Sequence, residues 1–102
     1  MFRRRFADVI RRQLDLFERD HADLLADLRA AERAYERAAG EEAEERYADV
    51  DELVETAGEL LANLRDAYIG SLDEAASIAY ADAFRRAAAR RFGSFALELE
   101  ES

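Results

Sequence analysis

Glu18 and His21 are the two residues whose types and spacing could bind a metal ion. Residues three positions apart on a helix are neighbours on one face, so the two side chains would point the same way. Because the chain has one histidine and no cysteine, the other ligands would have to be carboxylates. The carboxylates expected opposite His21 all fall on outward helix positions; they are Glu52, Glu55, Glu59 and Asp66. We therefore interpret His21 as part of a helix-packing seam and expect no metal or other cofactor.

A second candidate is the segment Gln13-Leu14-Asp15-Leu16-Phe17. It resembles the short Gln-Leu-x-Leu-Phe peptide with which many bacterial proteins bind the replication sliding clamp. Such peptides usually bind from flexible termini or loops, whereas Leu14 and Phe17 also have the spacing of a packed helix. The resemblance implies clamp binding if this helix unravels, and helix packing explains the same side chains without a clamp.

Arginines gather at two places in the chain. Residues 2–12 carry five arginines and one aspartate in an amphipathic pattern, which could anchor the chain on anionic lipid or form a solvated helix face. Four more lie near the end of the last expected helix, where they oppose the helix dipole. We expect this second group to form ion pairs within the chain, where it would lie level with acidic residues of the middle helix, or between subunits. The arginines are Arg85, Arg86, Arg90 and Arg91, and the acidic residues are Asp51, Glu52 and Glu55.

The composition excludes several other functions. Four serines, one threonine and one histidine form no evident nucleophile–base set, so we expect no enzyme activity. The net charge of −9 comes from 15 arginines and 24 acidic residues, and it disfavours nucleic-acid binding. No apolar stretch approaches the ~20 residues that cross a bilayer, and residues 1–6 lack the apolar run of a secretion signal. We expect a cytoplasmic chain, and its alanine-rich composition without lysine is typical of a GC-rich bacterial genome.

The elements that must position these residues follow from the apolar spacing. Over residues 2–39 the apolar positions recur in alternating steps of four and three, a heptad seam with His21 as its one polar member. The same alternation over residues 42–69 predicts a second helix, and Gly40 and Gly70 are expected to end these two helices. Their short connection predicts a long antiparallel, coiled-coil-like hairpin. The expected pairs are Tyr35–Tyr47, Leu28–Val54, His21–Leu61 and Leu14–Tyr68.

A shorter third helix is predicted over residues 72–92, followed by a tail. Ser71 and Glu74 have the spacing of a capping box, in which Ser71 caps the new helix. Gly93 is expected to end it. Residues 93–102 change to a period of two, which suits an extended segment that lies on its own subunit or on a neighbour, or that docks on a partner.

The predicted fold is a single all-α domain, with a three-helix body and a slender acidic arm. The third helix is apolar on two sides, whereas the hairpin can cover only one of them, so we expect a homodimer. The residues expected at its interface are Ile78, Tyr80, Ala81, Phe84, Phe92, Phe95, Leu97 and Leu99.

The leading functional hypothesis is a non-catalytic helical interaction module that self-associates and uses its arm or tail to bind a protein partner. Two long antiparallel helices and a short third one resemble small encapsulated ferritin-like proteins, in which an iron site forms at a dimer interface. That architectural resemblance implies the alternative of a metal-binding bundle around Glu18 and His21, completed between subunits. The basic amphipathic N-terminus as a surface anchor is the third hypothesis.

Overall fold

The computed structural model of the chain describes residues 2–93 and residue 95, with side chains from residue 6 onward. This part of the chain forms four helices and no strand, so the predicted all-helical class is confirmed. The helices are α1 (Phe2–Asp20), α2 (Ala22–Arg37), α3 (Glu41–Ile69) and α4 (Glu74–Phe92).

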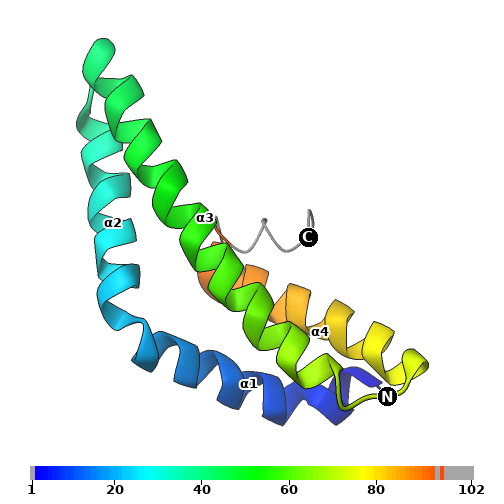
Figure 1. The fold of residues 1–102 in the computed structure, drawn as a ribbon. Coiled ribbons are helices and arrows are strands. Elements are labelled where there is room, and N and C mark those ends of the chain that lie inside the picture. Colours follow the sequence, from blue (N-terminus) through cyan, green and yellow to red (C-terminus); the bar gives the residue numbers. More distant parts are fainter. Residues whose placement is uncertain (1, 94, 96–102) are drawn as a thin grey trace.

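The helix expected over residues 2–39 is interrupted at His21, so the prediction of one continuous helix was wrong. His21 has φ −120° and ψ 31°, which lies outside the helical region, and α1 and α2 meet there at a wide angle (Figure 1). Hydrogen bonds still reach this residue from both sides. The His21 N–H donates to the Phe17 carbonyl at 3.0 Å, and the Leu25 N–H donates to the His21 carbonyl at 3.0 Å. No proline or glycine lies at the bend, so tertiary packing accounts for it.

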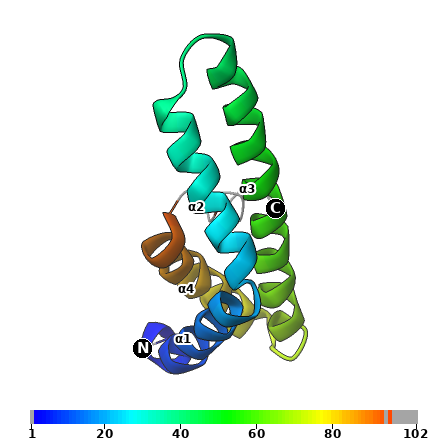
Figure 2. The ribbon, with the colours of Figure 1, turned by 90° about the vertical axis from the view of Figure 1, so that its left-hand side faces the viewer.

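Each half of the interrupted helix packs against a different partner. α1 lies along α4, and α2 lies along α3 (Figures 1 and 2). Leu14 and Phe17 are buried in the first half, and Leu25 and Leu28 are buried in the second. A straight helix would carry one of these pairs away from its partner, whereas the bend allows both pairs to leave water. The pairing expected between α1 and α3 is therefore replaced by packing of α1 on α4.

The hairpin was predicted correctly at the end where α2 and α3 are connected. The Tyr35 and Tyr47 rings, which were expected to pair, lie 5.7 Å apart between centroids. Gly40 has φ 63° in the connection between α2 and α3, a conformation that favours glycine. At the other end of α3, Tyr68 contacts Phe6 at 6.5 Å and so reaches α1 at one point.

The start of α4 differs from the predicted capping box. Asp73 is the N-cap, and its Oδ1 accepts a 2.8 Å hydrogen bond from the Ala76 N–H. The Ser71 hydroxyl instead donates to the Tyr68 carbonyl at 2.8 Å, so it satisfies the end of α3. The helix starts at Glu74 rather than at residue 72, and it ends at Gly93 (φ 68°) as predicted.

The molecule is elongated. Its radius of gyration is 15.3 Å and its extents are 49 × 25 × 20 Å, whereas a compact chain of this length has a radius of gyration of about 13 Å. The elongation comes from α2 and the first half of α3, which project as an arm beyond α1 and α4 (Figures 1 and 2). The core follows the contacts of α1 with α4 and of α2 with α3.

Candidate association surfaces

The inward side of α4 is filled by Tyr80 and Phe84, which are both fully buried. The Tyr80 ring lies 5.4 Å from the Phe6 ring of α1 and 4.7 Å from the Tyr68 ring of α3, so it joins three helices. Its hydroxyl donates a 2.8 Å hydrogen bond to Oε1 of Gln13. Burial raises the pKa of Tyr80 to about 12, because the phenolate would lose its hydration. Tyr80 therefore acts as a neutral core residue with one polar contact to α1.

A second aromatic cluster holds the end of α4 against α1. The Phe17 ring lies 5.5 Å from the Phe92 ring and 6.2 Å from the Phe95 ring. Phe92 is partly buried, and Phe95 is only 3% exposed. Phe95, the first large apolar residue of the predicted tail, thus packs on its own chain, whereas Leu97 and Leu99 lie outside the described residues.

The residues predicted to form a dimer interface divide between surface and core. Ile78 is 67% exposed on the outer side of α4, and Ala81 is partly exposed. Tyr80, Phe84 and Phe95 are instead buried within their own chain, so they cannot lie on a free face. The exposed apolar strip is consequently narrower than expected, because α4 buries one side against α1 and part of another against α3.

Ion pairs of Arg91 link α4 to α1. Arg91 lies 2.6 Å from the Asp15 carboxylate and 3.4 Å from that of Glu18, with its own side chain 28% exposed. This arginine was expected to lie level with acidic residues of α3, and it meets α1 because α4 lies along α1. Arg85 and Arg86 each form an ion pair with Asp82 of the same helix.

A groove of about 510 Å³ lies between α1 and α4. Ala7, Ala83 and Ala87 line part of it, and their short side chains leave the space open. Among the described residues, those that line the groove include no acidic side chain, although acidic neighbours pair with three of its arginines. Four arginines line it, namely Arg11, Arg86, Arg90 and Arg91. The groove was not predicted from the sequence; Ala83 and Ala87, one turn apart on α4, were the available signal.

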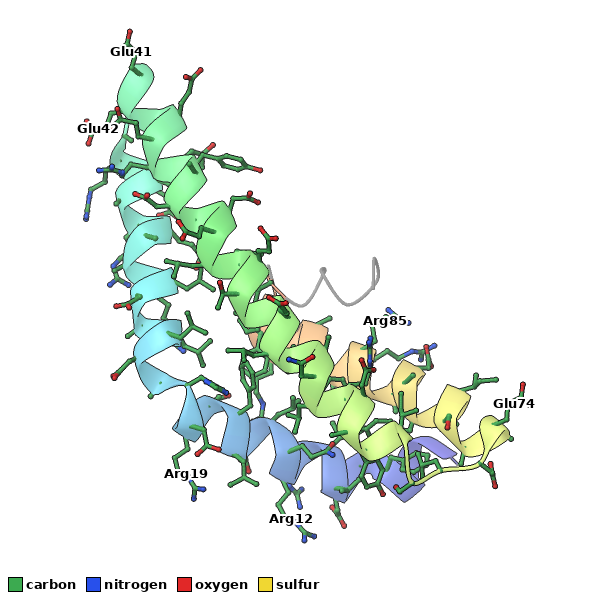
Figure 3. All side chains as sticks on the ribbon, in the orientation of Figure 1. Arg12, Arg19, Glu41, Glu42, Glu74 and Arg85 are labelled. Carbon is green, nitrogen blue, oxygen red and sulfur yellow. The ribbon has the colours of Figure 1, made fainter. Side chains whose placement is uncertain are left out.

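The far end of the arm has the opposite charge. We call residues 35–47 the arm tip. Glu41, Glu42 and Glu44 lie there on the first turns of α3 and form no ion pair within the described part of the chain; Figure 3 labels the first two. The Tyr35 and Tyr47 rings beside them are 42% and 56% exposed. The arm tip therefore combines exposed aromatic surface with unpaired carboxylates.

Glu18 and His21 each contact another residue of their own chain. The Glu18 carboxylate is engaged by Arg91, and the His21 ring packs on Phe17 at 4.9 Å. Within the described residues, no three His, Asp or Glu side chains come close enough together to hold an ion. Our interpretation of His21 as a packing residue fits these contacts.

The clamp-like segment from Gln13 to Phe17 lies within α1. Leu14 is 1% exposed and Phe17 is 3% exposed, and Gln13 accepts the hydrogen bond from Tyr80. A clamp could reach these side chains only if α1 left α4. The structure therefore uses the same residues to hold its own core.

Comparisons with family models, with curated proteins and with solved structures found no match to this chain. None of the described helices combines the length and the apolar character that crossing a bilayer requires.

Proposed function

We propose that this chain is a non-catalytic helical association module that forms a homodimer through the outer face of α4. The observation that carries the proposal is the exposure of Ile78, a large aliphatic side chain that is 67% exposed one turn after the start of α4. Ala75 is also exposed there, and Ala79 and Ala81 are partly exposed. Small neighbours allow two helices to approach closely, so Ile78 could pack against its symmetry mate.

The total surface of the chain supports association. The chain exposes 6850 Å², whereas a compact monomer of its mass, 11.6 kDa, exposes about 5,800 Å². The excess of about 1,000 Å² is comparable with the ~800 Å² that each partner buries in a standard interface. A chain of this size has little core, so a partner that covers this surface adds substantially to its stability.

Sedimentation equilibrium at micromolar protein tests the dimer. We expect a mass near twice 11.6 kDa for the unmodified chain. Ile78→Glu should dissociate it, because two carboxylates would face each other across the two-fold axis in place of two apolar side chains. The control Glu59→Gln changes an exposed residue of α3 and should leave the mass unchanged.

A monomer mass with full helicity for the unmodified chain contradicts the dimer. An unaltered dimer in Ile78→Glu contradicts the α4 face as its site. Circular dichroism of the variant shows whether α4 is still helical, so loss of association can be separated from loss of fold.

A further inference from the structure

The charges of this chain are separated between its two ends. α1, α4 and the second half of α3 (residues 56–69) carry eleven arginines and eight acidic residues, whereas α2 and the first half of α3 (residues 41–55) carry four arginines and twelve acidic residues. One end is therefore net positive, although the whole chain has a charge of −9. Surfaces of opposite charge steer two molecules together and select their orientation. Two copies of this chain would attract each other when the arm of one faces α1 and α4 of the other.

The α1–α4 groove is the concave feature of the positive end. Arg90 is exposed beside it and forms no ion pair within the described residues. Arg11 pairs with Asp8 at 3.1 Å and Arg86 pairs with Asp82 at 3.1 Å, each with a neighbour on its own helix. Exposed ion pairs of this kind contribute little to the free energy of folding. These arginines can therefore exchange their present partner for another carboxylate with little loss of stability. The groove thus offers an apolar lining with arginines that can accept an acidic partner.

The arm tip has the complementary chemistry. Glu44 and Asp51 are exposed and unpaired within the described chain, and they lie one turn before and one turn after Tyr47 on the same face of α3. Tyr47 itself has more than half of its surface in water. Tyrosine is enriched among the residues that dominate protein interfaces, because its ring supplies contact area at a small entropy cost. The groove volume of about 510 Å³ is sufficient for an aromatic ring and neighbouring side chains.

We propose that the arm tip of one copy docks in the α1–α4 groove of a second copy, with Tyr47 against the alanine lining and with Glu44 and the adjoining Asp51 against Arg86 and Arg90. This contact adds a second self-association surface to the proposed function, at a place separate from Ile78. Because the groove and the arm tip are different surfaces, the contact is heterologous and can link successive copies.

Charge-reversal variants of the full chain test this contact by sedimentation velocity. The groove variant is Arg86→Glu with Arg90→Glu, and the arm variant is Glu44→Arg with Asp51→Arg. Each alone should weaken the association beyond the dimer by roughly tenfold or more in Kd, because like charges then face each other. An equimolar mixture of the two variants should associate again, since the acidic groove of one accepts the basic arm of the other. Wild-type association should weaken as salt rises from about 0.05 M to about 0.5 M.

Two matched control variants have the same net charges as the groove and arm variants, but their reversed residues lie on other surfaces. Arg12→Glu with Arg19→Glu changes two arginines that point away from the other helices in Figure 3, and Glu55→Arg with Glu59→Arg changes exposed residues of α3. Both controls should associate like the wild type apart from a small effect of overall charge. Circular dichroism checks that every variant remains helical, and neutral Arg86→Gln with Arg90→Gln serves if the reversed groove variant unfolds.

Two results overturn the proposal. The first is an arm variant with wild-type association, because the groove would then accept some other acidic segment. The second is a mixture that does not associate although both variants are folded. Repeating the series in an Ile78→Glu background separates the two surfaces. If the dimer proposal is wrong, Ile78→Glu will not change the sedimentation mass. If the docking proposal is wrong, the groove and arm variants will not change it.

Discussion

Replacement of Tyr80 by phenylalanine removes one hydroxyl from the core and should change both the stability and its dependence on pH. The Tyr80 side chain is fully buried, and its hydroxyl donates a 2.8 Å hydrogen bond to Gln13. Loss of such a bond costs about 1 kcal/mol, because the Gln13 oxygen loses its donor while the ring contacts remain. At neutral pH we therefore expect Tyr80→Phe to lower the free energy of unfolding by about 1 kcal/mol.

The pH dependence follows from the raised pKa of Tyr80, about 12 in the folded chain against 10.0 for an unperturbed tyrosine. The folded state holds this proton more tightly than the unfolded state, so the stabilisation is complete below pH 10 and is lost as the pH rises towards 12. A difference of about two units corresponds to about 2.7 kcal/mol at the upper limit. Phenylalanine cannot ionise, so the stabilities of the two proteins should become equal near pH 11, to within about half a unit.

Urea denaturation followed by circular dichroism at a series of pH values from about 8 to about 11.5 measures both effects. Tyr47→Phe is the matched control, because its ring is 56% exposed and its hydroxyl forms no hydrogen bond with the described residues. A stability difference between Tyr80→Phe and the wild type that stays constant over this range would refute the reasoning about burial. A stabilising effect of Tyr80→Phe at pH 7 would refute the reasoning about the hydrogen bond.

Three further predictions concern the ends and the bend of the helices. Asp73→Ala should lower the free energy of unfolding by about 1 kcal/mol, because it removes the N-cap of α4. Urea denaturation should show a smaller loss of stability for Ser71→Ala than for Asp73→Ala. The reverse order would favour the capping box. Phe95→Ala should cost about 3 kcal/mol, since a buried ring leaves the aromatic cluster; a loss below about 1 kcal/mol by the same method would contradict its packing. His21→Leu should leave the helix content unchanged by circular dichroism and raise the melting temperature, because a half-buried imidazole is replaced by an apolar side chain. Elemental analysis that finds stoichiometric metal in the wild type and none in His21→Leu would reject the packing role.

The sequence by itself determined the features that depend on local spacing. The absence of proline and the abundance of helix formers made the chain helical, and heptad spacing close to Gly40 placed Tyr35 against Tyr47. Gly93 ended the last helix, because a left-handed residue at that position costs glycine little. These features involve residues that are close in the chain or that are joined by a short turn, so few arrangements compete with the observed one.

Only the tertiary structure decided the bend at His21 and everything that follows from it. The heptad seam continues without error through this residue, and both Leu24 and Leu25 are apolar, so the sequence allowed a straight helix as well as a bent one. The observed packing of α1 on α4 and of α2 on α3 removes apolar side chains of both halves from water, among them Leu14, Phe17, Leu25 and Leu28. That packing of distant segments also set the partner of Arg91 and opened the α1–α4 groove, and periodicity within one segment carries no information about it.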